Sequence, residues 1–276
     1  MYGDLDRPPL HAEVLERALV APGSIWSSVE VVESSPSTNA ELVDRAGSSD
    51  VDGVVLIAEH QTAGRGRLQR TWTAPVRSGL TMSALVRPDD VAAARWPWIP
   101  LLAGLAVAAT LRRDADVPAT LKWPNDVLIE ERKVAGLLVE RVEPSAGRGR
   151  PAAVIGIGLN VSLTEAEIPV PTATSLVLAG ASATDRSLLA RGVLRSLEGL
   201  LLDWYRHGGD PRGGLQTAYA DACSTLGRQV HIDQPDGRQL RGEAVAVDDT
   251  GRLVVQTAEG QVAVGAGDVL HLRSQT

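Results

Sequence analysis

One stretch of the chain combines glycine and arginine in a way that suits the binding of an anion. Residues 63–72 read Ala-Gly-Arg-Gly-Arg-Leu-Gln-Arg-Thr-Trp and follow an apolar run, residues 54–58, that predicts a buried strand. Glycines let backbone N–H groups approach an anion closely, and guanidinium forks match phosphate and carboxylate oxygens. A solvated basic loop is the other interpretation of this stretch, and the rest of the chain decides between them.

Three further motifs carry residues that could do chemistry. They are Lys122-Trp-Pro-Asn125-Asp126, Lys133-Val-Ala-Gly136 and Gly156-x-Gly158-x-Asn160. Either lysine could instead be an ordinary solvated residue at the end of a strand. The last motif is not a dinucleotide fingerprint, because Val161 stands where the third glycine would be. The sequence also lacks a P-loop signature, a Gly-x-Ser-x-Gly elbow and a cluster with metal-ligand spacing.

Composition excludes several classes of protein. The 276 residues carry a formal charge of −7, which argues against a broad nucleic-acid-binding surface but leaves room for a local anion site. The one cysteine, Cys223, rules out a disulfide framework and a Cys-rich zinc site, and we interpret it as a core residue. The chain shows neither a leader nor an apolar run of about 20 residues, so we expect a cytoplasmic protein without a membrane span.

Alternating strands and helices must position these motifs. Thr38 and Glu41 have the spacing of a capping box, which predicts a short helix through Ala46. The segment 119–129 predicts a strand interrupted by Pro124, with a return strand over 133–140. Other strands are predicted at 29–33, 80–86 and 152–161, and helices at 10–20, 96–113, 185–205 and 215–223.

The predicted secondary structure changes after Leu226. Short alternating strands are predicted at 229–232, 239–247, 253–257 and 261–264, joined by tight turns. They indicate a small SH3-like barrel, so we divide the chain into domains 1–223 and 224–276. The residues before the first strand are too few for a three-helix DNA-binding domain, and we expect no DNA binding.

Taken together, the motifs resemble the ordered motifs of the biotin–protein ligases. The matching segments are Ser37-Thr38-Asn39, Gln61 to Arg67, Trp72, Lys122 to Asp126, Lys133 to Gly136 with Glu140, and Gly156 to Asn160. The resemblance covers about residues 30–270 in family order. It implies an α+β fold, in which a mixed β-sheet with flanking helices forms a class II synthetase-like catalytic domain and an SH3-like barrel follows.

The resemblance also implies a two-step reaction that uses ATP and Mg²⁺. The biotin carboxylate attacks the α-phosphate of ATP, which gives biotinoyl-5′-AMP and pyrophosphate. One lysine of a biotin carboxyl carrier domain of acyl-CoA or pyruvate carboxylases then attacks the anhydride and releases AMP. Because two anions must meet, fixed positive charge aimed at the transition state is the main catalytic requirement.

The family's functional residues map onto positions of this chain. The resemblance implies that Lys133 and Arg67 are catalytic. The implied biotin contacts are Ser37, Thr38, Asn39, Gln61, Gly64, Arg65, Arg67, Lys133 and Gly136. The implied ATP contacts are Arg67, Arg70, Trp72, Lys122, Asn125 and Asn160. It assigns no metal ligand.

One departure and three alternatives accompany this interpretation. Leu68-Gln69 replaces the basic residue and glycine usual in the family loop, which makes the loop stiffer, and we expect altered loop ordering over biotin without loss of activity. A lipoate or octanoyl ligase or transferase would share the fold. A biotin-responsive repressor and an inactive biotin-binding protein are alternatives from other functional classes.

Overall fold

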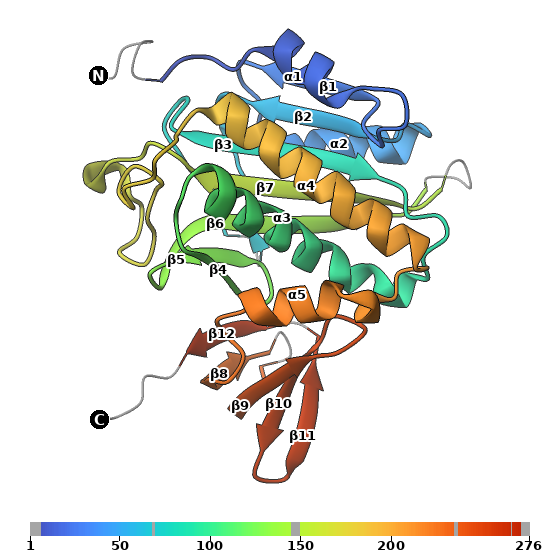
Figure 1. Ribbon diagram of the computed structural model, residues 1–276, viewed down its shortest axis with the longest axis vertical. Helices are drawn as coiled ribbons and strands as arrows, with labels where there is room; N and C mark the ends of the chain where they lie inside the picture. The colour runs from blue at the N-terminus through green and yellow to red at the C-terminus, as the bar shows by residue number, and fades with distance from the viewer. Residues whose placement is uncertain (1–6, 68–69, 145–149, 235–236, 266, 272–276) are drawn as a thin grey trace.

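The computed structural model describes residues 7–67, 70–144, 150–234, 237–265 and 267–271 (Figure 1). The departure at Leu68-Gln69 lies outside these residues. The first domain contains strands β1 (Ser28–Val32), β2 (Val54–Ala58), β3 (Gly79–Val86), β4 (Ala119–Lys122), β5 (Asp126–Ile129), β6 (Arg132–Val142) and β7 (Ala152–Asn160). Its helices are α1 (Ala12–Leu19), α2 (Thr38–Ser48), α3 (Ile99–Asp114), α4 (Arg186–Arg206) and α5 (Leu215–Ala222), with short 3₁₀ turns at Ala93–Trp98, Glu165–Glu167 and Pro211–Gly213.

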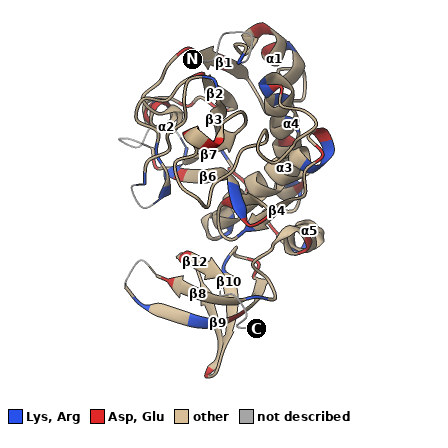
Figure 2. Ribbon diagram, turned by 90° about the vertical axis from the view of Figure 1, so that its left-hand side faces the viewer, with Lys and Arg blue, Asp and Glu red and all other residues tan. Residues whose placement is uncertain are grey.

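A seven-stranded sheet forms the first domain, in the order β1-β2-β3-β7-β6-β5-β4. Strands β1 and β2 are parallel, whereas the other described neighbours are antiparallel. Helices α3 and α4 cover one face and α2 covers the other, which Figure 2 shows from the side. The predicted mixed sheet with flanking helices is therefore confirmed.

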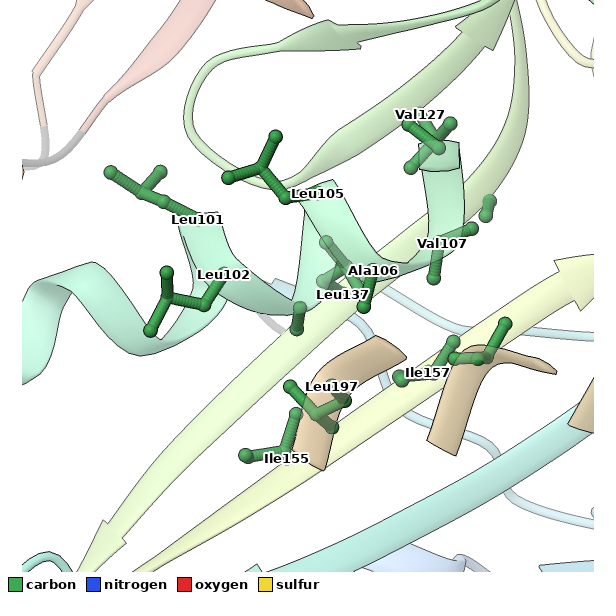
Figure 3. Close-up of a cluster of buried hydrophobic side chains, with 14 of the residues drawn as sticks. Leu101, Leu102, Leu105, Ala106, Val107, Val127, Leu137, Ile155, Ile157 and Leu197 are labelled. Atoms are coloured by element: carbon green, nitrogen blue, oxygen red, sulfur yellow. The ribbon is translucent and has the colours of Figure 1, made fainter. Parts of the chain in front are cut away.

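The core lies between α3 and the centre of the sheet. Leu101, Leu102 and Leu105 of α3 are buried, and Figure 3 shows this helix above Leu137 of β6 and Ile157 of β7. The segment Ala93–Asp114 is long and apolar enough to cross a membrane, but 67% of its most apolar window is buried inside the protein. Its apolarity is that of a core helix, because an element covered on most sides has little need of a polar face.

The predicted strand 119–129 is a hairpin. Strands β4 and β5 pair with each other, so the chain reverses at Trp123, Pro124 and Asn125 where the sequence predicted an interruption in one strand. Proline lacks the N–H that a strand interior needs, and Asn-Asp is turn chemistry, so Trp-Pro-Asn-Asp favours reversal. The reversal pairs Lys122 with Asp126.

The start of α2 also differs from the prediction. Ser37 is the N-cap, and its hydroxyl accepts a hydrogen bond from the backbone N–H of Ala40 at 3.4 Å. The Thr38–Glu41 capping box is wrong because both side chains have other partners. The Thr38 hydroxyl is bonded to Ser83, and the Glu41 carboxylate accepts from Ser35 at 2.5 Å. Thr38 is thereby free of a capping role and faces the sheet.

The C-terminal domain is a second sheet, with strands β8 (Gln229–Asp233), β9 (Gln239–Val247), β10 (Leu253–Thr257), β11 (Gly260–Val264) and β12 (Asp268–His271). Their order is β11-β10-β9-β8-β12, antiparallel throughout. The four predicted strands are present. The fifth, β12, was missed because four residues are too few to show a clear alternation of apolar and polar side chains. The boundary proposed near Ser224 falls in the turn between α5 and β8.

Trp123 joins the two domains. Its backbone N–H donates to the Thr225 hydroxyl at 3.1 Å, and its indole N–H donates to the carbonyl of Gly251 at 3.1 Å. The ring is buried. The β4–β5 turn is therefore anchored in the C-terminal domain.

Candidate active site

Two neighbouring cavities open beside the β6–β7 strand pair. The smaller, of about 60 Å³, lies among the start of α2, β3, β6 and β7. The larger, of about 1540 Å³, lies between the first domain and strands β8 and β12. Both are lined by Gly66, Arg67, Trp72, Asn125 and Lys133. The two residues implied to be catalytic, Lys133 and Arg67, therefore stand where the cavities meet.

The small cavity collects nearly all the residues implied to bind biotin. Its lining includes Ser37, Thr38, Asn39, Gln61, Arg65, Arg67, Lys133 and Gly136. The backbone N–H of Thr38 donates to Oε1 of Gln61 at 2.9 Å, and the Thr38 hydroxyl lies 2.7 Å from that of Ser83. These hydrogen-bonding side chains share the recess with the apolar Met82, Leu137, Leu138 and Ile157, and convergent polar groups beside apolar ones suit a small-molecule site.

Asn39 is a buried part of this polar group. Its Oδ1 accepts from the Ser83 hydroxyl at 2.6 Å, and its Nδ2 donates to Glu140 at 2.8 Å. A Cβ at Gly156 would lie 2.2 Å from Oδ1 of Asn39, so only glycine leaves room for the amide. Sequence reasoning missed Ser83 and assigned no role to Glu140; the side-chain alternation of β3 and β6 toward the recess is the signal that could have found both.

Gly64 does not line the small cavity but shapes the Gly/Arg loop. The Gly64 carbonyl accepts from the backbone N–H of Trp72 at 2.9 Å, and the Arg70 carbonyl accepts from Gly66 at 2.7 Å. A Cβ at Gly64 would lie 2.3 Å from the Trp72 carbonyl oxygen. These bonds bring the two ends of the described part of the loop together. The role of Gly64 here is to let its backbone lie close to that of Trp72, which a side chain would prevent.

The Trp72 ring rests on two glycines of the sheet. A Cβ at Gly158 would lie 2.5 Å from the indole Cε2, and one at Gly136 would lie 3.1 Å from Cζ3. The ammonium of Lys133 is 5.7 Å from the ring centroid. Because Gly136 and Gly158 have no side chains, the indole can pack directly against β6 and β7 at the junction of the cavities.

Lys133 is positioned through its backbone and its ammonium group. Its N–H donates to the Thr172 carbonyl at 2.7 Å, and its carbonyl accepts from Thr174 at 2.9 Å. Its Nζ lies 2.6 Å from Oδ1 of Asp126, with one third of the lysine side chain exposed. Sequence reasoning gave Asp126 no role, because only the β4–β5 reversal turns its carboxylate toward Lys133.

Arg67 reaches the same junction from the loop. Its Nη1 donates to Oδ1 of Asn125 at 2.8 Å, while Asn125 Nδ2 donates to the Leu137 carbonyl at 2.8 Å. Burial lowers the pKa of Arg67, and the charges of Asp268 and Asp126 oppose that shift. Guanidinium groups remain protonated in proteins, so Arg67 supplies a partly desolvated positive charge at the junction.

The large cavity is lined by all six residues implied to bind ATP: Arg67, Arg70, Trp72, Lys122, Asn125 and Asn160. Arg70 is ion-paired with Asp268 of β12, which links the Gly/Arg loop to the C-terminal domain. Asn160 is buried and donates from Nδ2 to the Thr174 carbonyl at 2.9 Å. In this structure it supports the cavity wall.

The C-terminal domain adds residues that sequence reasoning did not name. Arg228 pairs with Glu131 at 2.7 and 2.9 Å, and His271 shares a 3.0 Å hydrogen bond with the Thr225 hydroxyl. Burial lowers the pKa of His271, and the positive charges of Lys122 and Arg228 add to the effect. Non-local pairing places these residues, so spacing within the chain gives no signal for them.

The described residues contain no group of three or more His, Cys, Asp or Glu side chains arranged to hold a metal ion. Mg²⁺ usually keeps several waters and binds through one or two carboxylates together with substrate phosphates. The donor set in this part of the chain fits a magnesium ion carried by a triphosphate better than a resident one.

Comparisons with known proteins agree with this geometry. Residues 29–161 match the model of the biotin/lipoate A/B protein ligase family, and residues 225–272 match that of the biotin protein ligase C-terminal domain. The chain is 42% identical over 271 residues, 97% of each chain, to the biotin–[acetyl-CoA-carboxylase] ligase of Mycobacterium tuberculosis. It is 31% identical to the bifunctional ligase/repressor BirA of Escherichia coli, over 90% of this chain and 74% of that protein.

A solved structure supports the same relationship. The biotin protein ligase of Aquifex aeolicus in complex with biotin and ATP superposes with a TM-score of 0.71 at 28% identity, covering 90% of this chain and all of the other. The chain belongs to the biotin/lipoate A/B protein ligase family, in its biotin–protein ligase branch.

Proposed function

We propose that this protein attaches biotin to a lysine of a biotin carboxyl carrier domain, using ATP and passing through biotinoyl-5′-AMP. The name of the Mycobacterium tuberculosis relative and the ligands of the Aquifex aeolicus structure support this function. Because ATP and an unmodified carrier are both substrates, we expect the reaction to take place in the cytoplasm.

The observation that carries the proposal is the junction of the two cavities. A small polar recess and a large basic cavity share Lys133 and Arg67 on their lining. Biotin in the recess would extend its carboxylate toward this junction, and ATP in the large cavity would bring its α-phosphate there. Of the residues implied to bind biotin, Ser37, Thr38, Asn39, Gln61, Arg65 and Gly136 line only the small cavity. Of those implied to bind ATP, Arg70, Lys122 and Asn160 line only the large one.

The first step then follows from electrostatics. A carboxylate oxygen attacks the α-phosphorus, and pyrophosphate leaves with the electrons of the broken P–O bond. Lys133 and Arg67 offset the repulsion between the two anions, and Arg70 and Lys122 neutralise the departing phosphates. Charge that is already positioned needs no reorganisation during the reaction, which makes such groups effective.

The second step uses the same junction from the side of the large cavity. The carrier's lysine amine attacks the acyl carbon, the C–O bond to AMP breaks, and the amine loses a proton. Asp126 lies beside Lys133 and could accept that proton once a phosphate has drawn Lys133 away. Magnesium enters with ATP, and no residue of this chain is assigned to it.

The polar recess favours biotin over lipoate or octanoate. The group formed by Thr38, Asn39, Gln61 and Ser83 offers hydrogen bonds that a ureido ring can use and that an alkyl chain or a dithiolane cannot. A site built for hydrogen bonding discriminates strongly against a ligand that leaves its buried polar groups unpaired.

The test is an assay of both steps with matched substrates. The purified chain is incubated with biotin, ATP, Mg²⁺ and a biotin carrier domain, and pyrophosphate, AMP and the carrier's mass are followed. Lipoic acid with a lipoyl domain is the control. Pyrophosphate release that requires biotin, with biotin on the carrier lysine, is the expected result. Modification of the lipoyl domain alone would contradict the proposal.

A further inference from the structure

Lysine is almost absent from this chain, and both lysines are in the candidate site. Of its 27 basic residues, Lys122 and Lys133 are the lysines and the rest are arginine. Both line the large cavity between the domains. The two ε-amines are therefore gathered where the proposed reaction produces an activated acyl group.

The distinction matters because an acyl adenylate reacts with amines. A neutral ε-amine attacks the acyl carbon of a mixed anhydride, whereas a guanidinium stays protonated and is a poor nucleophile. Proximity strongly favours the amine that is held closest, since effective concentrations within one molecule far exceed those in solution. A lysine at the opening of the cavity would therefore compete with the carrier.

The two lysines present are engaged in the site itself. Lys133 is ion-paired with Asp126 at 2.6 Å, so its ammonium group is already engaged. Lys122 lines the same cavity, and its partner across the β4–β5 hairpin is the acidic residue Asp126. Neither is then a good acceptor while the intermediate is bound.

The rim of the large cavity offers no substitute. We define this rim by Arg70, Val170, Arg228 and Leu270, which line the cavity from both domains. Val170 is 50% exposed and Leu270 is 54% exposed. The cations of the rim are guanidinium groups, and its other two members are exposed apolar side chains.

We propose that the amine-free rim lets the enzyme hold its acyl adenylate without modifying itself, and that any lysine placed on this rim becomes an acceptor. The inference rests on the proposed function, since it requires the adenylate. In the transfer, the C–N bond to the new lysine forms and the C–O bond to AMP breaks. AMP leaves with the electron pair, and the amine's proton passes to water or to Asp126.

A matched pair of valines tests this inference. Val170 lines the large cavity and is 50% exposed, whereas Val177 does not line it and is 48% exposed. The variants Val170→Lys and Val177→Lys are incubated with biotin, ATP and Mg²⁺ without a carrier, and biotin is located by peptide mass spectrometry. Proximity predicts at least about ten-fold more biotin on position 170 than on position 177.

A second pair guards against a local folding defect. Leu270→Lys places the amine on the rim from the C-terminal domain, and Val262→Lys, at a 39% exposed position outside the cavity lining, is its control. Pyrophosphate release is measured in every variant, so that each one is known to form the adenylate. Modification of both rim variants, with both controls and the unaltered chain unmodified, is the expected result.

Three outcomes would overturn the inference while leaving the proposed function intact. Rim variants that release pyrophosphate yet stay unmodified would show that proximity does not select the acceptor. Equal modification of positions 170 and 177 would point to adenylate released into solution. Biotin on Lys122 or Lys133 of the unaltered chain would show that these amines are not protected. Absence of pyrophosphate release from the unaltered chain would instead remove the proposed function, and the inference with it.

Discussion

The ammonium nitrogen of Lys133 on β6 lies 2.6 Å from a carboxylate oxygen of Asp126 on the neighbouring strand β5. The pair places a positive charge at the junction of the two cavities and fixes its direction. In the proposed reaction, Lys133 would exchange this carboxylate for substrate oxygens. Its removal should therefore affect chemistry more than folding.

Replacing Lys133 by alanine should slow adenylate formation by at least about 100-fold, the size expected when one positioned donor is lost from a transition state. Single-turnover pyrophosphate release measures the rate. Arg132→Ala is the control, because Arg132 is exposed and lines neither cavity. A K133A rate equal to that of the unaltered chain would remove Lys133 from the mechanism.

Arg70→Ala should weaken ATP binding and leave biotin binding almost unchanged. Arg70 lines the large cavity and not the small one, and a hydrogen bond to a charged group contributes about 1.5–3 kcal/mol. The KM for ATP should then rise about ten-fold or more. Calorimetric titration with biotin is the internal control, and a selective loss of biotin affinity would contradict the assignment.

Gly156→Ala should damage the biotin recess. The added Cβ would lie 2.2 Å from Oδ1 of Asn39, so the amide must leave its bonds to Ser83 and Glu140. Overpacking of this kind costs about 1–3 kcal/mol, and biotin affinity should fall with it. Gly199→Ala, where a Cβ meets nothing within 4 Å, should keep its affinity and gain up to about 1 kcal/mol in helix propensity.

Arg186→Met should destabilise the fold markedly. Arg186 pairs with Glu59 at 2.5 Å with both side chains buried, and its Nη2 also donates to the Pro8 carbonyl. Loss of one partner leaves a buried carboxylate, at a cost of about 3–5 kcal/mol in the free energy of unfolding. Urea denaturation measures it. Arg17→Met, which breaks an exposed pair with Glu13, should cost less than about 1 kcal/mol.

His271 should make stability depend on pH below neutrality. Because its pKa is lowered in the folded protein, the unfolded chain binds the proton first as pH falls through about 6.5. The free energy of unfolding therefore decreases from about pH 7 toward the folded pKa of His271. Glu131, whose pKa Arg228 lowers by hydrogen bonding, loses its contribution only at more acidic pH.

The measurement compares melting temperatures at about pH 7 and about pH 5.5 for the unaltered chain and for His271→Asn. The variant should lose less on acidification, whatever its stability at pH 7. Parallel losses in the two proteins would show that His271 is not the group responsible.

The elements of the first domain were predicted well where the apolar residues follow a single repeat, either that of a helix or that of a strand. The helices α3 and α4 and the apolar strands were predicted from the spacing of apolar residues. This works because the buried face of a helix or strand is formed by residues that are close together in the sequence. The 119–129 segment was misread because its apolar residues suit one strand or two. Only pairing between Lys122 and Asp126 distinguishes them, and pairing depends on the rest of the sheet.

The candidate site shows the same division. The motifs located the residues that gather around the two cavities, because their types are dictated by chemistry. The partners of those residues, such as Ser83 for Asn39 and Asp268 for Arg70, come from distant strands. Their side chains are ordinary for their positions, so nothing in the local sequence marks them.

Trp123 ties the turn beside the candidate site to the C-terminal domain. The turn that carries Asn125 and leads into Asp126 is fastened to Thr225 through the backbone N–H of Trp123 and to Gly251 through its indole. A truncated protein ending near Ser224 would lose those anchors and expose a large buried ring. We expect such a fragment to be destabilised around the β4–β5 turn. Inhibitor design or engineering aimed at the first domain should therefore use the whole chain.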